Sequence, residues 1–473
     1  GIMYGSVMFV VSVVLSIRAN SQCPPKLVVI SLVVLLASHL LYDYDTHSIT
    51  FGDPPEQTTL EEGLYYHHHH HHHNSDNENN NNNSNNSNNS YIPSIVQHWP
   101  ESDRTYHKEV ATSWMPSGDT RTGLPFVFNR PGDVEFHRVF LATEDDEYVG
   151  LDIAFPPSSG YNSSKPIYMI LHGLNGGTKE KYVKDFAHRS TAEGYTVVVM
   201  IARGLMDLPI RGWNLFHGAR TSDAHAAAVA LRQAFGRDQL IIGVGYSMGA
   251  IVLSNYVASY GIECPLDAAM AISGGLDLRY QMDYTRGKRL WSPFLTIIAR
   301  EKFFLGKWGH RVKERLSESN FRNMIRAKDN IELDSAAAAA YSGFDDVHHY
   351  YQSASALGDI PHNKDDDSIL DDSGHFLTPK KIDNVSIPLV VLHSLDDPII
   401  TWRATCANQG LMHPSNLVQT GKGNLMILLT KSGGHVGWPI GFWFSHHGGK
   451  WMSNAVMSFG TAVQEAKQLQ QPQ

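Results

Sequence analysis

The stretch that decides the fold is LIIGVGYSMGAIVL, which runs from Leu240 to Leu253. Its opening apolar residues indicate a strand buried on both faces, and residues 250–253 indicate the start of a helix. Between them, GYSMG at residues 245–249 matches the pattern G-x-S-x-G, in which a serine stands on a sharp turn from a strand to a helix. The glycines let the backbone turn tightly around a strained serine. Ser247 is therefore predicted to be a nucleophile.

Apolar strand-like runs alternate with helical runs on both sides of this stretch. Strands are predicted at 135–142, 147–155, 167–171, 195–202, 240–244, 268–273, 389–393 and 425–430, and helices near 181–193, 222–235, 248–260 and 452–468. The turn TEDD at residues 143–146 makes the first two strands a hairpin. The later strands do not alternate between apolar and polar residues, so we expect a mostly parallel sheet with helices on both faces. With the serine turn, this pattern predicts an α/β-hydrolase fold, with a cap inserted at about 276–386.

Composition excludes several classes of protein. The net charge of −9 and the pI of about 6.3 do not fit a nucleic-acid partner. The three cysteines, Cys23, Cys264 and Cys406, are far apart and form no CxxC pair, so neither a disulfide framework nor a thiolate zinc site is expected. No cofactor or metal is predicted for the chemistry, and the oligomeric state stays open.

Residues 1–109 divide into two regions before the predicted hydrolase domain at 110–468. Residues 1–42 hold two apolar runs, 2–17 and 27–42, each shorter than the ~20 residues that a membrane helix needs. We interpret this region as a membrane anchor, with a cleaved targeting segment as the alternative. The charges around the second run would place the hydrolase domain on the lumenal side. Residues 43–109, with a histidine tract and an asparagine-serine tract, are predicted to be a disordered linker.

The acid that orients the base should follow a late strand. The strand at 389–393 leads into Asp396 and Asp397. We predict Asp397 as the acid, because an aliphatic pair at 399–400 follows it where the chain re-enters the fold. Asp396 is the close alternative, and Asp277, after the preceding strand, is a more distant one.

The predicted base is His435, in SGGHVG at residues 432–437, directly after the strand at 425–430. A histidine of the core would stand within an apolar pattern, whereas one in a glycine loop at the end of a strand can point into a site. A serine hydroxyl needs such a base to take its proton. The chain order of serine, acid and histidine is the order that this fold requires.

Two backbone N–H groups should stabilise the oxyanion that forms during acyl transfer. One belongs to Met248, the residue after the nucleophile. The other should come from the loop HGLNGG at 172–177, which follows an early strand, and we assign it to Leu174.

At these residues the chain resembles the YheT-like, embryogenesis-associated branch of abhydrolase-domain proteins within the α/β-hydrolase superfamily. The resemblance runs from about Trp114 to Phe459 and includes residues 172–174, 198–204, 214–219, 245–249, 350–351, 353–355, 396–398, 433–435 and 451–452. It implies a membrane-associated esterase or lipase that acts on acyl esters, in some members glycerolipids or phospholipids. The family's triad falls on Ser247, Asp397 and His435. An acidic stretch at 359–376 departs from the family's pattern.

The predicted function is hydrolysis of carboxylic acyl esters, of lipids above all, through an acyl-enzyme. An acyltransferase that uses the same acyl-enzyme is one alternative, and a non-catalytic binding protein of this fold is another. Residues 286–315 combine nine cations with several aromatic side chains. We interpret them either as a surface that faces anionic lipid or as an ordinary solvated part of the cap.

Overall fold

The computed structural model describes residues 58–67, 91–106, 115, 117–157, 160–174, 176–362, 380–441 and 449–470. The two apolar runs predicted to be an anchor, 2–17 and 27–42, lie outside these residues, as do all but the first residue of the histidine tract. Within the described ranges, no helix combines the length and the apolar character that a bilayer span requires.

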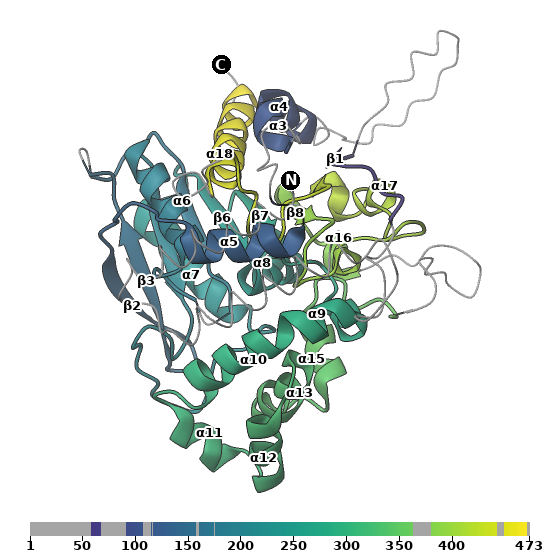
Figure 1. The fold of residues 1–473 in the computed structure, drawn as a ribbon. Coiled ribbons are helices and arrows are strands. Elements are labelled where there is room, and N and C mark those ends of the chain that lie inside the picture. The colour runs from purple at the N-terminus through teal and green to yellow at the C-terminus, as the bar shows by residue number, and fades with distance from the viewer. Residues whose placement is uncertain are drawn as a thin grey trace, which may run out of the picture.

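A sheet of nine strands forms the centre of the described structure, in the order β1-β9-β8-β7-β6-β4-β5-β3-β2 (Figure 1). The strands are β1 (Gly63–Tyr65), β2 (His137–Ala142), β3 (Tyr148–Ala154), β4 (Ile167–Leu171), β5 (Thr196–Ile201), β6 (Ile241–Tyr246), β7 (Ala268–Ile272), β8 (Leu389–Ser394) and β9 (Leu425–Thr430). Pairing is parallel from β5 through β9, and β3, β2 and β1 are antiparallel to their neighbours. The predicted α/β-hydrolase fold, with its mostly parallel sheet and its hairpin, is confirmed.

Helices cover both faces of the sheet because successive side chains of each strand point to opposite faces. On β4, Met169 packs with helices α7 (Ser222–Phe235) and α8 (Met248–Tyr260). Ile170 packs instead with α6 (Lys181–Ala192) and α18 (Lys450–Gln470). Every residue of β4 through β9 is buried, as their unbroken apolar runs predicted.

A layer of short helices follows β7 in the chain. It lies on one side of the sheet and of the helices that cover the sheet, as the green ribbons in Figure 1 show. These cap helices are α9 (Thr285–Leu290), α10 (Ser292–Ala299), the π-helix η3 (Arg300–Phe304), α11 (Gly309–Arg315), α12 (Glu318–Arg326), α13 (Asn330–Leu333), the π-helix η4 (Asp334–Ala339), α14 (Ala340–Ser342) and α15 (Val347–Ala354). They pack around Val312, Met324 and Leu333, in a hydrophobic cluster that also includes Ile251 of α8. The sequence predicted an inserted cap at about 276–386 but not its individual helices, because most of them are too short to show a clear apolar period.

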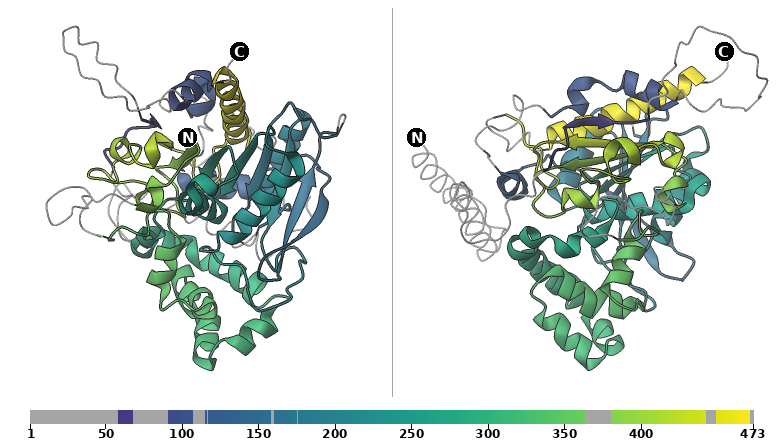
Figure 2. Two further views of the ribbon diagram at one scale, coloured as in Figure 1. Left: turned by 180° about the vertical axis from the view of Figure 1, so that it is seen from behind. Right: turned by 90° about the vertical axis from the view of Figure 1, so that its right-hand side faces the viewer.

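Two described segments correct the prediction that residues 43–109 are a disordered linker. Strand β1 pairs with β9 at the edge of the sheet, and α3 (Tyr91–His98) and α4 (Glu101–Arg104) lie beside α18 (Figure 2). Trp99 is 1% exposed, and its indole N–H donates to Ser458 Oγ over 3.1 Å. The prediction is wrong for these segments because a few apolar residues within a polar region can still bury against a distant helix.

The remaining described helices and 3-10 segments lie between or before the strands. They are α5 (Gly118–Phe128), α16 (Lys380–Asp383), α17 (Pro414–Leu417) and the 3-10 segments η1 (Gly261–Glu263), η2 (Leu278–Asp283), η5 (Trp402–Ala404) and η6 (Gly421–Gly423). Helix α5 begins with a capping box, in which Ser117 Oγ accepts from the N–H of Thr120 and the Thr120 hydroxyl accepts from the N–H of Ser117.

Candidate active site

Ser247 stands on the turn between β6 and α8 in a strained backbone conformation. Its φ is 55° and its ψ is −120°, a region that residues other than glycine rarely adopt. The turn needs small residues around it, since a Cβ on Gly249 would lie 2.0 Å from the carbonyl oxygen of Leu171 on β4. Both glycines of GYSMG are therefore required by packing, and the turn holds the serine hydroxyl at the carboxyl edge of the sheet.

His435 lies between Ser247 and Asp397. Its Nε2 is 2.8 Å from Ser247 Oγ, and its Nδ1 is 2.8 Å from Asp397 Oδ2. Because a carboxylate can only accept, Nδ1 carries the proton, which leaves Nε2 to accept the hydrogen bond from the serine hydroxyl. The structure thus brings together the three side chains that the sequence singled out.

The carboxylate of Asp397 is held in one orientation by its neighbours. Its Oδ1 accepts from the backbone N–H groups of Ile399 and Ile400, both over 2.9 Å, while Oδ2 faces His435. The side chain is 0% exposed. The three donors leave the carboxylate a single orientation, in which Oδ2 faces the imidazole of His435.

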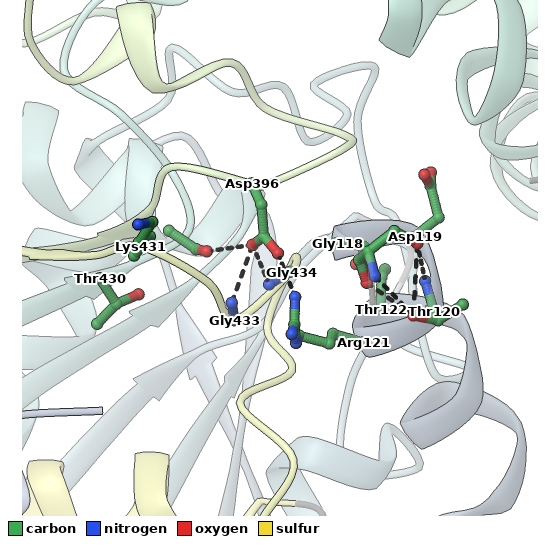
Figure 3. A network of polar contacts seen from close by, with 12 residues as sticks. Gly118, Asp119, Thr120, Arg121, Thr122, Asp396, Thr430, Lys431, Gly433 and Gly434 are labelled. Atoms are coloured by element: carbon green, nitrogen blue, oxygen red, sulfur yellow. Dashed lines mark hydrogen bonds and ion pairs between the residues drawn. The ribbon is translucent and has the colours of Figure 1, made fainter. Parts of the chain in front are cut away.

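The two alternative acids point elsewhere. Asp396 accepts from the N–H groups of Gly433 and Gly434 and pairs with Arg121, as Figure 3 shows. Asp277 forms a buried ion pair with Arg279, with 2.7 Å between Oδ2 and Nη2. Neither carboxylate contacts His435 in the described structure, which leaves Asp397 as the residue in the orienting position.

The N–H group of Met248 is available to an incoming oxyanion for a structural reason. Met248 is the first residue of α8, and the first N–H groups of a helix have no acceptor within it. In the loop after β4, the N–H of Gly173 already donates to Tyr182 Oη over 2.9 Å. Leu174, the second predicted donor, lines the same cavity as Ser247.

His172 fixes the loop that carries Leu174. Its Nδ1 donates to the carbonyl of Gly173 over 2.7 Å, and its Nε2 accepts from the N–H of Ala202 over 3.3 Å. Burial lowers the pKa of His172, which keeps the imidazole neutral in this bridging role. No function was predicted for this histidine beyond its place in the HGL motif at residues 172–174.

A cavity of about 230 Å³ opens onto the serine and the histidine. Its wall is mostly apolar and comes from both the sheet side and the cap, with lining residues that include Leu174, Ile251, Leu278, Trp291, Leu295 and Ile331. Asp334 is an exception on the cap side, where Tyr351 Oη donates to its Oδ2 over 2.8 Å. Burial raises the pKa of Asp334 to about 7.

Several cations in residues 286–315 contact the chain's own groups. Arg286 pairs with the buried Asp119, which also accepts from the indole N–H of Trp291 over 2.7 Å. Arg300 donates to the carbonyl of Ala327 over 3.1 Å. These contacts favour a structural role for these two cations over direct contact with a lipid surface.

Sequence reasoning missed two side chains that support the site. Thr122 Oγ1 accepts from the N–H of His435 over 2.7 Å, and Ser273 Oγ accepts from the N–H of Val436 over 3.0 Å. Thr122 belongs to α5, which carried no motif. Ser273 follows β7 and has a φ of 55°, but nothing in the sequence around it indicated that strain.

Comparison with known proteins gives several relatives of low identity. No protein-family model matches the chain. It is 25% identical over 361 residues to the phospholipase ABHD3 of Mus musculus, a match that covers 75% of this chain and 78% of that protein. It is 24% identical to the putative esterase YheT of Escherichia coli, with 73% of this chain and 91% of that protein covered. A monoacylglycerol lipase of Saccharomyces cerevisiae is 26% identical over 60% of this chain, which is 57% of that protein.

Proposed function

We propose that the chain is a serine-dependent hydrolase of carboxylic acyl esters and a member of the abhydrolase-domain family of α/β-hydrolases, as its similarity to a phospholipase, a monoacylglycerol lipase and a putative esterase supports. One observation carries the proposal above all. His435 lies within 2.8 Å of both Ser247 Oγ and Asp397 Oδ2. That is the arrangement in which a histidine takes the proton of a serine hydroxyl while a carboxylate holds its tautomer.

In the proposed reaction, His435 Nε2 takes the proton as Ser247 Oγ attacks the ester carbonyl. The N–H groups of Met248 and Leu174 hold the oxyanion of the tetrahedral intermediate. His435 then gives the proton to the leaving alcohol, which departs and leaves an acyl group on Ser247. A water molecule, deprotonated by His435, attacks the acyl group; the bond to Ser247 Oγ breaks, the acid leaves, and His435 returns the proton to Ser247 Oγ. Asp397 stabilises the imidazolium form in both halves of the reaction.

The apolar lining of the cavity favours a substrate whose acyl group is apolar and binds there. Leu174, Ile251, Leu278 and Leu295 surround it with aliphatic surface, and burial of each methylene of an acyl chain contributes about 0.8 kcal/mol. We therefore propose lipid acyl esters as the substrate class, in agreement with the phospholipase and monoacylglycerol lipase names of two relatives. Esters of short acids should be hydrolysed with a lower kcat/KM than esters of longer ones.

The direct test of the function is the substitution Ser247→Ala. Labelling by a fluorophosphonate probe and hydrolysis of a panel of lipid esters should both disappear, because no hydroxyl remains to attack. Ser259→Ala is a matched control, since Ser259 is an exposed serine of the same helix α8 and donates only to Asn255. Labelling that survives in Ser247→Ala would contradict the proposal.

We also propose that the full chain associates with membranes through residues 1–42, with the hydrolase domain on the lumenal side. The support is the pair of apolar runs at 2–17 and 27–42. The full chain should float with liposomes in a density gradient, whereas a chain that begins at residue 43 should not. Equal flotation of the two chains would contradict this assignment.

A further inference from the structure

The carboxylate of Asp396 holds the turn that carries His435. Its Oδ1 accepts from the backbone N–H groups of Gly433 and Gly434, over 2.9 and 2.8 Å (Figure 3). The hydroxyl of Ser394 also donates to Oδ1. One carboxylate oxygen therefore fixes both amides that directly precede His435 in the chain.

The other oxygen of Asp396 ties this turn to helix α5. Oδ2 lies 2.8 Å from Arg121 Nη1, and the two side chains are only 24% and 12% exposed. An ion pair that is partly shielded from water is stronger than one on the open surface. Figure 3 shows Arg121 reaching from α5 to Asp396, on the same side as the two glycine amides.

Helix α5 also packs directly against the turn. A Cβ on Gly118 would lie 1.7 Å from the carbonyl oxygen of Asp396, and a Cβ on Gly434 would lie 2.6 Å from the carbonyl oxygen of Gly118. Contact this close leaves no room for the turn to shift toward α5. One turn of helix further on, Thr122 Oγ1 accepts from the N–H of His435 itself.

We propose that Asp396 and Arg121 are positioning residues, which set the place of the His435 imidazole between Ser247 and Asp397. The inference rests on the proposed function, because it concerns the same histidine. Three consecutive N–H groups, those of residues 433, 434 and 435, donate to Asp396 or to α5. The backbone of the base is thus fixed by residues that never contact the reacting atoms.

The effect should fall on kcat and leave substrate binding nearly unchanged. Proton transfer needs a hydrogen-bond distance between base and nucleophile, and a displacement of about 1 Å can cost a factor of about 100 in rate. Asp396 is absent from the lining of the cavity that opens onto Ser247. We therefore expect Asp396→Ala to lower kcat about 10- to 100-fold and to change KM by less than about threefold.

Two further variants separate positioning from a general loss of structure. Asp396→Asn keeps an oxygen that can accept from the two glycine amides, so its kcat should stay within about fivefold of wild type. Arg121→Met keeps those hydrogen bonds and removes only the anchor on α5, so we expect a smaller loss of kcat than in Asp396→Ala. Arg121→Met also keeps the inference testable if Asp396→Ala does not fold.

The matched control is Asp267→Ala. Asp267 also pairs with an arginine, Arg232 at 2.7 Å, and also accepts from a backbone N–H, that of Ile241, but it lies before β7 at the opposite edge of the sheet. Asp267→Ala should reduce thermal stability without lowering kcat of the folded protein. A kcat in Asp396→Ala within threefold of wild type would overturn the inference, as would an equal loss in Asp267→Ala or no recovery in Asp396→Asn. A wild-type chain that neither hydrolyses esters nor reacts with fluorophosphonate would instead overturn the proposed function.

Discussion

The substitution Asp397→Asn exchanges one oxygen of the orienting carboxylate for an NH2 group. The structure decides which way the new amide faces. Oδ1 of Asp397 accepts from the N–H groups of Ile399 and Ile400, and an NH2 group cannot accept from either. The amide oxygen must therefore stay on that side, and the NH2 group must face His435 Nδ1.

That orientation reverses the tautomer of His435. To accept from the new NH2 group, Nδ1 must give up its proton, and a neutral imidazole then carries the proton on Nε2. Nε2 lies 2.8 Å from Ser247 Oγ and could no longer accept the serine's proton. In serine hydrolases of this arrangement the same change lowers kcat by about 10⁴, which corresponds to about 5.5 kcal/mol of transition-state stabilisation.

The assay is steady-state hydrolysis of a soluble ester, together with the rate of fluorophosphonate labelling. Thermal unfolding of the variant should show a folded protein, because Asn is nearly the same size as Asp and its oxygen keeps the hydrogen bonds to Ile399 and Ile400. Asp396→Asn is the neighbouring control, and its kcat should stay within about fivefold of wild type. An Asp397→Asn variant whose kcat lies within tenfold of wild type would refute the tautomer argument.

Two predictions concern stability. Arg203→Met removes a cation that is 1% exposed and leaves the equally buried Asp223 without its ion pair. The free energy of unfolding, measured by chemical denaturation, should therefore fall by about 3–5 kcal/mol. A fall below about 1 kcal/mol would contradict this prediction. Burial raises the pKa of Asp334 from 3.8 to about 7, so the folded state holds a proton that the unfolded chain has already lost, and this contribution to stability disappears as the pH rises from about 4 to 7. The melting temperature of wild type should therefore fall more between pH 4.5 and pH 8 than that of Asp334→Asn, and parallel pH profiles would disprove the assignment.

The predicted fold class and the central secondary structure are confirmed by the strand order of the sheet. Helices α7 and α8 and strands β4 and β9 have the predicted bounds, and the other central strands agree within about two residues. The agreement has a physical reason. Strands buried on both faces must be apolar throughout, and a helix that follows such a strand must change to another period, so each segment carries its own signal.

The choice between Asp396 and Asp397 could not be made with the same certainty from the sequence. The two residues are adjacent, equally acidic and follow the same strand. Only the hydrogen bonds of the folded chain separate them, since one carboxylate meets the imidazole and the other meets the glycine amides of the same turn. The support that α5 gives to His435 could not be predicted from the sequence either, because 313 positions separate Thr122 from the histidine that it contacts.

The sequence by itself determined the strands and the serine turn, because each depends on residues that are neighbours along the chain, and it set the order of the residues that we propose as nucleophile, acid and base. The tertiary structure alone decided which carboxylate faces His435, which helices form the cap and which part of the N-terminal region packs on α18. These three features depend on contacts between side chains that are far apart in the sequence and meet only after the sheet has formed. The local sequence around a residue does not indicate which distant residue it will contact.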